Sequence, residues 1–158
     1  MKAIVFFDGG CAPKNPGHAA FAVVVKLGKK RHVLSRYIGV HTNNYAEYSG
    51  LIVAVKYAKE LGAQSVEIYS DSQLVVNQVN GKWKIKNSDI RTLAVQAQDL
   101  LKRYYPMAWE LKWIPREKNA LADYYCTLAI NHGRNRNPWL KKKRPEKIVD
   151  EFSAAGRV

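Results

Sequence analysis

The sequence predicts one α/β domain with a mixed five-stranded sheet and helices on both faces. An apolar run from Ile4 to Gly10 is typical of a buried strand, and it ends on the carboxylate of Asp8 and two glycines. Two more strand-like runs follow before any helical pattern, which indicates that the first three strands are antiparallel. Helical and strand patterns then alternate, so the remaining strands join the same sheet through helical connections.

Turn residues separate the first three expected strands. A loop with two prolines, Cys11 to Gly17, follows the first strand. The next two runs, Ala19 to Lys26 and Arg31 to Val40, flank a hairpin tip that contains Gly28. We therefore expect a three-stranded antiparallel unit whose first strand lies centrally in the complete sheet.

Helices and two short strands complete the expected domain. Thr42-Asn43-Asn44 offers capping residues to a helix that Gly62 ends, and the strand Val66 to Ser70 follows. The later elements are a helix of residues 74–79, a helix of residues 88–105 capped by Ser88, a strand of residues 108–114 and a last helix that begins after Asn119. Beyond residue 131 the composition turns basic and proline-broken, so we expect a domain of residues 1–131 and a basic tail of residues 132–158.

The formal net charge is +13, from 26 Lys and Arg against 13 Asp and Glu. A surplus of this size in a small protein predicts a polyanionic partner, and nucleic acid is the first candidate. The sequence has no run long enough to span a membrane and no signal-peptide pattern, so we expect a soluble, cytoplasmic protein with no membrane partner. The two cysteines lack the spacing of a zinc site and are expected to be free thiols.

Four carboxylates stand out because their neighbours are apolar. Asp8 and Asp71 end strands, whereas Glu47 and Asp123 lie on the apolar stripes of two helices. If the first and fourth strands are parallel neighbours, Asp8 and Asp71 lie side by side at the sheet edge where open α/β sheets place their sites. Each acid alone is compatible with a turn or a helix start. Together the four predict one acidic pocket.

Such a pocket requires cations, because clustered negative charges repel strongly in a low dielectric. Oxygen ligands favour Mg²⁺ or Mn²⁺ over zinc. A carboxylate pocket that holds two Mg²⁺ ions about 4 Å apart is suited to in-line attack of water on a phosphodiester. This chemistry agrees with the basic composition around the acids.

At these residues the chain resembles type 1 ribonuclease H. The resemblance covers roughly Lys2 to Ile130, and four blocks match the family's motifs in order and spacing: Asp8-Gly9-Gly10, Thr42-Asn43-Asn44-Tyr45-Ala46-Glu47, Asp71-Ser72-Gln73 and Asn119-Ala120-Leu121-Ala122-Asp123. It implies the ribonuclease H-like fold and endonucleolytic cleavage of the RNA strand of an RNA/DNA hybrid, leaving 5′-phosphate and 3′-hydroxyl ends. It also implies that the catalytic residues and metal ligands are Asp8, Glu47, Asp71 and Asp123.

The resemblance further implies a substrate-binding surface. Asn15, Asn43 and Gln73 are expected to read the minor groove of the hybrid, where the 2′-hydroxyls of RNA are exposed. Cys11 and Thr42 neighbour these residues and are assigned to the same surface.

Two features depart from the family pattern. Many members carry a histidine on the loop before the last aspartate, but Trp113 to Lys118 contains none. Glu117 is a candidate auxiliary residue that perturbs the second metal, and the alternative is a simple first-turn acid. Only Gly81 to Asn87 separates two helices where some members insert a long basic handle.

Trp83, Lys84 and Lys86 lie in this short segment. One interpretation is that they hold the DNA strand by stacking and phosphate contact. The other is that Trp83 packs in the core beside Val79.

Four other side chains carry expectations about their surroundings. Cys11 and Cys126 each lie three residues from an expected metal ligand, so we expect both thiols near the rim of the site. Trp109 and Trp113 alternate with Leu111 on a strand and are expected in the core.

Two alternatives to a hybrid-cleaving enzyme remain. One is another nuclease of the same architecture, such as a junction resolvase or a reverse-transcriptase domain; the start at Met1 leads us to expect a free-standing protein, and we expect a monomer. The other is a module that binds a hybrid or duplex without cleaving it, although a pure binder gains nothing from four clustered acids facing phosphate.

Overall fold

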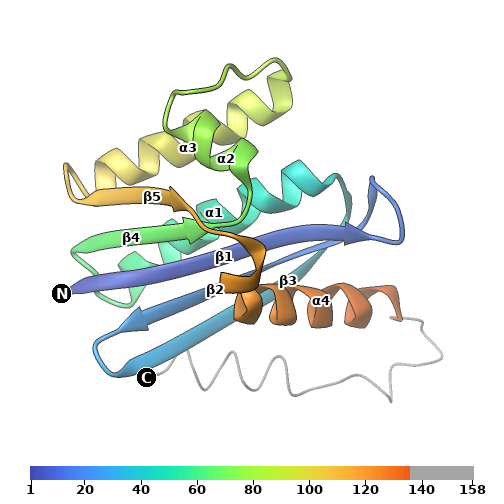
Figure 1. Cartoon of the computed structure of the whole chain (residues 1–158), viewed down its shortest axis with the longest axis horizontal. Helices are drawn as coiled ribbons and strands as arrows, with labels where there is room; N and C mark the ends of the chain where they lie inside the picture. The colour runs from blue at the N-terminus through green and yellow to red at the C-terminus, as the bar shows by residue number, and fades with distance from the viewer. Residues whose placement is uncertain (136–158) are drawn as a thin grey trace.

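The structure, a computed structural model that describes residues 1–135, has one five-stranded sheet in the order β3-β2-β1-β4-β5 (Figure 1). The strands are β1 (Lys2–Ala12), β2 (Gly17–Leu27), β3 (Lys30–His41), β4 (Ser65–Ser70) and β5 (Trp109–Trp113). β1, β2 and β3 pair in antiparallel fashion, whereas β4 is parallel to both β1 and β5. The predicted mixed sheet, with an antiparallel N-terminal unit and a central first strand, is confirmed.

Helices cover both faces of this sheet. They are α1 (Asn43–Glu60), α2 (Gln73–Val79), α3 (Ser88–Tyr104) and α4 (Ala120–Arg134), with a short 3₁₀ turn, η1 (Arg116–Lys118), before α4. α1 packs on β1 and β2 and supports α3, whereas α4 packs on β1, β2 and β3 from the opposite face (Figure 1). The main core lies between the sheet and α1, where alternate β1 residues Ala3, Val5 and Phe7 are buried with Leu51 and Val55.

Helix caps agree with the sequence at one helix and differ at another. Thr42 Oγ1 accepts a hydrogen bond from the backbone N–H of Tyr45 (3.1 Å), so Thr42 is the cap of α1 among the three predicted capping residues, and Asn43 and Asn44 lie inside the helix. α3 is capped by Asn87, not by Ser88, because Asn87 Oδ1 accepts from the N–H groups of Asp89 and Ile90. Asn and Ser are both good capping residues. The backbone places the Asn87 side chain, and not that of Ser88, next to the free N–H groups.

The C-terminal boundary is described only in part. α4 continues to Arg134, three residues past the predicted domain end at 131. The predicted basic tail lies outside the described residues from 136 onward. Within residues 1–135, no helix combines the length and the apolar character needed to cross a membrane.

Gly9 permits the closest approach of α1 to the sheet. A Cβ atom at this position would overlap the backbone of Ala46 and Glu47. The neighbouring Gly10 has room for a Cβ atom, because the atoms nearest to that Cβ would be Asn43 Oδ1 at 3.9 Å and Ile130 Cδ1 at 4.0 Å. The backbone contact at Gly9 therefore sets how far Glu47 reaches toward the end of β1.

We predict that Gly9→Ala destabilises the protein by roughly 1–3 kcal/mol, because α1 must move away from β1 to accommodate the methyl group. Urea unfolding measures this change, and Gly10→Ala is the matched control. The control should stay within about 0.5 kcal/mol of wild type. Equal losses in the two variants would contradict the close approach at Gly9.

Candidate active site

Three of the four predicted acids meet where β1 and β4 stop pairing. Asp8 does not end its strand as predicted: β1 continues to Ala12 along β2, and Asp8 lies two residues past Phe6, the last β1 residue paired with β4. Asp71 directly follows β4, and Glu47 projects from the second turn of α1. One carboxylate oxygen from each lies within 4.8 Å of the other two. The parallel pairing of β1 with β4 brings the two aspartates together, and the approach of α1 over Gly9 adds the glutamate. These three residues are called the acid trio below.

Asp123 lies beside the acid trio but outside it. It projects from the first turn of α4, and its side chain is 37% exposed. Arg116 Nη2 lies 3.7 Å from Asp123 Oδ1. Hydrogen bonding and charge from Asp123 also contribute to the raised pKa of Asp8, so the fourth acid is an electrostatic neighbour of the trio.

Burial and mutual repulsion favour protons on the trio. Burial raises the pKa of Asp8 to about 8, with further contributions from the charge of Asp71 and from Asp123. The N–H of Gly9 donates to Asp8 Oδ1 at 3.0 Å and opposes part of this shift. Burial, followed by the charges of Asp8 and Asp71, raises the pKa of Glu47 well above its ordinary value.

The acid trio fits a divalent cation. Glu47 Oε2 is fully buried and has no hydrogen-bond partner within the described part of the chain. A buried acceptor without a donor is costly, and an ion held by this oxygen removes the cost. All the donor atoms are carboxylate oxygens, which suit hard cations such as Mg²⁺ and Mn²⁺.

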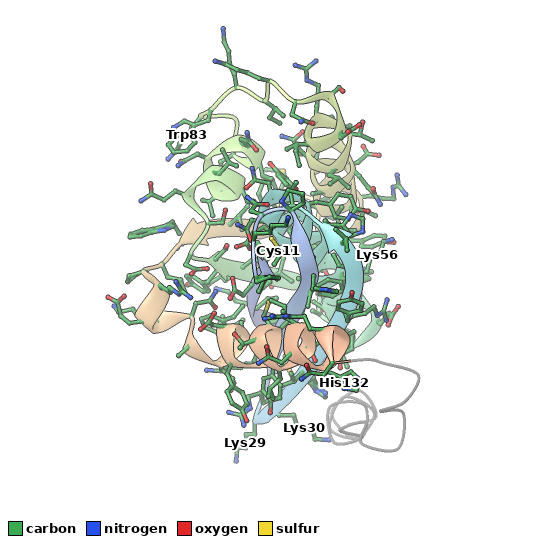
Figure 2. The ribbon with its side chains drawn as sticks, turned by 90° about the vertical axis from the view of Figure 1, so that its right-hand side faces the viewer. Cys11, Lys29, Lys30, Lys56, Trp83 and His132 are labelled. Atoms are coloured by element: carbon green, nitrogen blue, oxygen red, sulfur yellow. The ribbon has the colours of Figure 1, made fainter. Side chains whose placement is uncertain are left out.

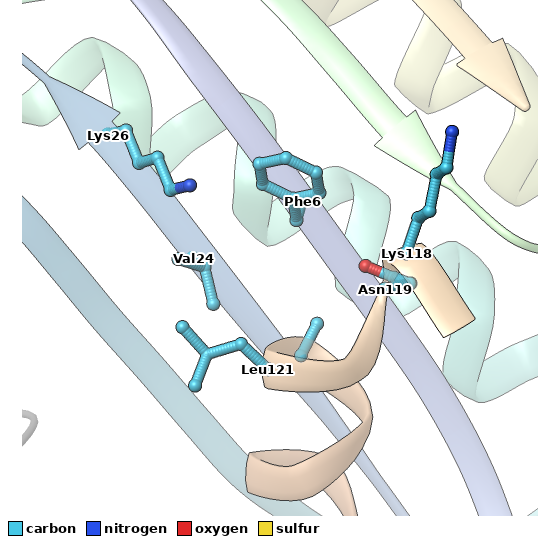
Figure 3. A pocket seen from close by; sticks show the side chains of 7 residues that line it. Phe6, Val24, Lys26, Lys118, Asn119 and Leu121 are labelled. Carbon is cyan, nitrogen blue, oxygen red and sulfur yellow. The ribbon is translucent and has the colours of Figure 1, made fainter. Parts of the chain in front are cut away.

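Asn119 holds the start of α4 against the site. Its side chain is buried, and its Nδ2 donates to the carbonyl oxygen of Phe7 (2.8 Å) and to Asp71 Oδ1 (3.1 Å). Asn119 also lines a small pocket of about 70 Å³, together with the ring of Phe6 and the side chain of Lys26 (Figure 3). The sequence analysis included Asn119 in the motif block that ends at Asp123 but assigned it no function. Its position four residues before Asp123 could have indicated that it lies close to the site.

Three of the predicted substrate-binding residues form one hydrogen-bonded group. Asn43 Oδ1 accepts from the backbone N–H of Cys11 at 3.0 Å and lies 3.2 Å from the Cys11 thiol. Asn15 Oδ1 accepts from the backbone N–H of Asn43 at 3.0 Å. These contacts join the loop after β1 to the start of α1 and orient both amides. Thr42 caps α1, and Gln73 is an exposed residue at the start of α2.

The short segment between α2 and α3 presents Trp83 to solvent. Trp83 is 46% exposed, so the interpretation that it packs in the core is wrong, and Ile85 packs against the core in its place. The backbone N–H groups of Lys82 and Trp83 both donate to the carbonyl of Asn77, at 2.8 and 3.1 Å. The backbone that carries the exposed indole is therefore held to the end of α2 by hydrogen bonds. Figure 2 shows it at the opposite end of the molecule from Lys29 and Lys30.

The flanking basic residues and Glu117 are also exposed. Lys84 and Lys86 both face solvent beside Trp83. Glu117 is exposed on η1, and within the described residues the acid trio does not include it. Its auxiliary role stays a prediction.

Two expectations about buried and exposed side chains are wrong. Cys126 is buried between α4 and β2, where its thiol lies 3.4 Å from the carbonyl oxygen of Ala20, so it is near the acids but is not exposed at the rim of the site. Trp113 is 45% exposed, whereas Trp109 on the same strand packs against the core as expected. Trp113 is the last residue of β5, and strand alternation alone does not reveal where along the strand the core ends.

The sheet order and the acid trio define a ribonuclease H-like domain, a class that other proteins share. Residues 6–129 match the reverse transcriptase-like family. The bifunctional protein Rv2228c of Mycobacterium tuberculosis is 41% identical over 134 residues, which are 83% of this chain and 36% of that protein.

Solved structures agree with this match. RNase H1 of Halobacterium salinarum has a TM-score of 0.76 and 33% identity, covering 83% of this chain and 98% of that one. LC11-RNase H1, solved in complex with an RNA/DNA hybrid, has a TM-score of 0.75 and 35% identity, covering 82% of this chain and 96% of that one. The chain belongs to the reverse transcriptase-like family, and its domain is a ribonuclease H domain related to the type 1 enzymes. It spans about a third of the length of the Rv2228c protein.

We predict that the metal-free protein becomes less stable as the pH rises from about 4 to about 8. Folded Asp8 keeps its proton to about pH 8, whereas an aspartate in the unfolded chain loses it near pH 4. In that window the folded state binds more protons, so the free energy of unfolding falls by up to roughly 1.4 kcal/mol per pH unit for each such proton.

Asp8→Asn removes the pH-dependent loss of stability caused by Asp8. In chelator-treated buffer, the free energy of unfolding of the variant minus that of the wild type should therefore increase from pH 5 to pH 8. Added Mg²⁺ should narrow the difference, because a cation stabilises the ionised acids of the wild type. Asp99→Asn, which alters an exposed acid paired with Arg103, is the control and should show a constant offset. Parallel pH profiles for wild type and Asp8→Asn would show that Asp8 is not protonated in the fold.

Proposed function

We propose that this protein is a metal-dependent endonuclease that hydrolyses the RNA strand of RNA/DNA hybrids and leaves 5′-phosphate and 3′-hydroxyl ends. The acid trio carries the proposal, because three carboxylates with a partnerless buried oxygen have no structural purpose without a cation. Membership of the ribonuclease H-related family supports the reaction type.

Asp8, Glu47 and Asp71 would hold the metal, with Asp123 completing the site from α4. We propose two Mg²⁺ ions, with Mn²⁺ as a substitute. Bound divalent cations supply activation of water and stabilisation of the leaving oxygen in phosphodiester hydrolysis. The hydrogen bond from Asn119 holds the Asp71 carboxylate in place before substrate arrives, which reduces reorganisation during the reaction.

The substrate is distinguished by its 2′-hydroxyl groups. Asn15, Asn43 and Gln73 would read them in the minor groove, with Cys11 and Thr42 shaping the same surface. The hydrogen bonds among Cys11, Asn15 and Asn43 support this assignment, because they fix the amides before binding. The solved complex of LC11-RNase H1 with an RNA/DNA hybrid supports the choice of substrate.

Trp83, Lys84 and Lys86 would hold the DNA strand. The exposure of the indole on a fixed backbone supports stacking, and the two exposed lysines suit phosphate contact. The monomeric state and the cytoplasmic location stay predictions.

We predict that Asp71→Asn abolishes cleavage and leaves hybrid binding largely intact, because the carboxylate serves the metal while the basic residues hold the backbone. The assay uses 5′-labelled RNA annealed to DNA, annealed to RNA, or single-stranded, each with and without Mg²⁺. Cleavage confined to the hybrid with Mg²⁺ is expected. Asp99→Asn, which removes an exposed acid of α3, should cleave like wild type.

Other outcomes of this assay identify the alternatives. Binding without cleavage by the wild type would indicate a non-catalytic module, and cleavage of other duplexes would indicate a different nuclease of the same fold. Near wild-type turnover by Asp71→Asn in Mg²⁺ would contradict the metal-ligand assignment.

We predict that Trp83→Ala weakens hybrid affinity by roughly 1–3 kcal/mol, because a stacking contact is lost. Lys84→Ala and Lys86→Ala should each lower the magnitude of the slope of log affinity against log salt by about 0.7–0.9. The turnover number should change little, since these contacts hold ground and transition states alike.

The matched controls are Lys29→Ala and Lys30→Ala at the tip of the β2–β3 hairpin, at the far end from Trp83 (Figure 2). They should leave the salt slope unchanged. Unchanged affinity of folded Trp83→Ala at several salt concentrations would rule out the contact with DNA.

A further inference from the structure

A small pocket on the α4 side of the sheet shares one side chain with the acid trio. Its volume is about 70 Å³, and it lies between β1, β2 and the start of α4. The residues that line it are Phe6, Val24, Lys26, Lys118, Asn119, Leu121 and Ala122 (Figure 3). The shared side chain is that of Asn119, which also contacts Asp71. The pocket and the acids are therefore in contact with the same amide.

The Asn119 amide presents a fixed acceptor to this pocket. Its Nδ2 donates to the carbonyl oxygen of Phe7 at 2.8 Å and to Asp71 Oδ1 at 3.1 Å, and these two bonds fix which way the amide faces. Its Oδ1 is buried and has no hydrogen-bond partner among the described residues. Figure 3 shows this oxygen pointing toward the space between Phe6 and Leu121. Because a buried acceptor without a donor is costly, a bound molecule that supplies the donor is stabilised here.

The charged residues of the lining limit which donor can enter. Lys26 Nζ lies 5.2 Å from the centroid of the Phe6 ring, and Lys118 borders the same pocket from η1. None of the seven lining residues is acidic. A cationic donor is therefore disfavoured, whereas a ligand with a neutral donor and an anionic group complements the site.

Apolar side chains and the small volume define the rest of the ligand. Val24 and Ala122 are buried, and with Phe6 and Leu121 they give the pocket apolar walls. A cavity that encloses benzene has about 150 Å³, roughly twice the volume found here. The body of the ligand must therefore be slim, as a short methylene chain is.

We propose that this pocket binds a short, unbranched hydroxy acid. The hydroxyl group donates to Asn119 Oδ1, the methylene groups contact the apolar walls, and the carboxylate is attracted by Lys26 and Lys118. Donation to Oδ1 polarises the amide and strengthens its hydrogen bonds to Phe7 and Asp71. The inference goes beyond the proposed function and does not depend on catalysis.

The test is an NMR titration of the isotopically labelled full-length protein in metal-free buffer. The probes are glycolate, 3-hydroxypropionate, 4-hydroxybutyrate and 5-hydroxypentanoate, which vary the distance between the hydroxyl group and the carboxylate. One length should bind best, with a Kd of roughly 1–10 mM. It should shift the methyl resonances of Val24 and Leu121 and the side-chain N–H resonances of Asn119 along one saturation curve.

Two analogues of the best probe separate its contacts. The unsubstituted acid with the same number of carbon atoms lacks the hydroxyl donor, and the corresponding diol lacks the negative charge. Each should bind about 3- to 10-fold more weakly, which is the effect of one net hydrogen bond or one partly exposed ion pair.

A pair of lysine variants tests the position of the carboxylate. Lys26→Gln should weaken binding of the hydroxy acid by about 2- to 5-fold and leave binding of the diol unchanged. Lys29→Gln is the matched control, because it removes the same charge from the tip of the β2–β3 hairpin and Lys29 does not line the pocket (Figure 2). This control should bind both probes like wild type.

Three outcomes overturn the proposal. They are equal affinity for the hydroxy acid and the unsubstituted acid, shifts that spread over exposed lysines without involving Asn119, and the lack of saturation with any probe, which leaves water as the donor to Asn119 Oδ1. The titration uses no nucleic acid and no metal. A failure of the proposed nuclease activity would therefore leave its result unchanged.

Discussion

The burial of like charges where β1 and β4 stop pairing is the constraint on which the site depends. Asp8 and Glu47 lose hydration and face Asp71, and one glutamate oxygen has no donor in the described structure. Such a group is stable only when protonated or when it holds a cation. The fold tolerates this cost because Gly9 lets α1 pack closely and Asn119 ties α4 to the same strand ends.

Around this acidic centre the chain arranges basic and aromatic groups at a distance. The net charge of +13 attracts a polyanion, and the clustered acids lie where the proposed reaction would cut phosphate. The groups proposed to contact substrate are held by backbone contacts before binding: the amides of Asn15 and Asn43 and the segment of Trp83. Pre-oriented groups lose less entropy when the substrate is bound.

The short connection between α2 and α3 distinguishes this chain from family members with a long basic handle. Eight residues, 80–87, separate the two helices. Ile85 packs against the core, while Trp83 faces outward. The same domain recurs within longer relatives: the matched residues are 36% of the bifunctional Rv2228c protein and 63% of the Halobacterium salinarum ribonuclease HI.

The sequence by itself determined the order of strands and helices, a capped start of α1 within residues 42–44, and the position of Asp71 at the end of β4, because hydrophobic periodicity and capping depend on neighbouring residues. It did not show that β1 continues past Asp8 to Ala12, because that extension depends on pairing with β2. Tertiary structure alone decided that Asp123 lies outside the acid trio, that Cys126 is buried, and that Trp113 is exposed. Exposure depends on which distant element covers a residue. Alternation on β5 shows that Trp109 and Trp113 share a face, but only the packed helices decide how far along the strand that face is covered.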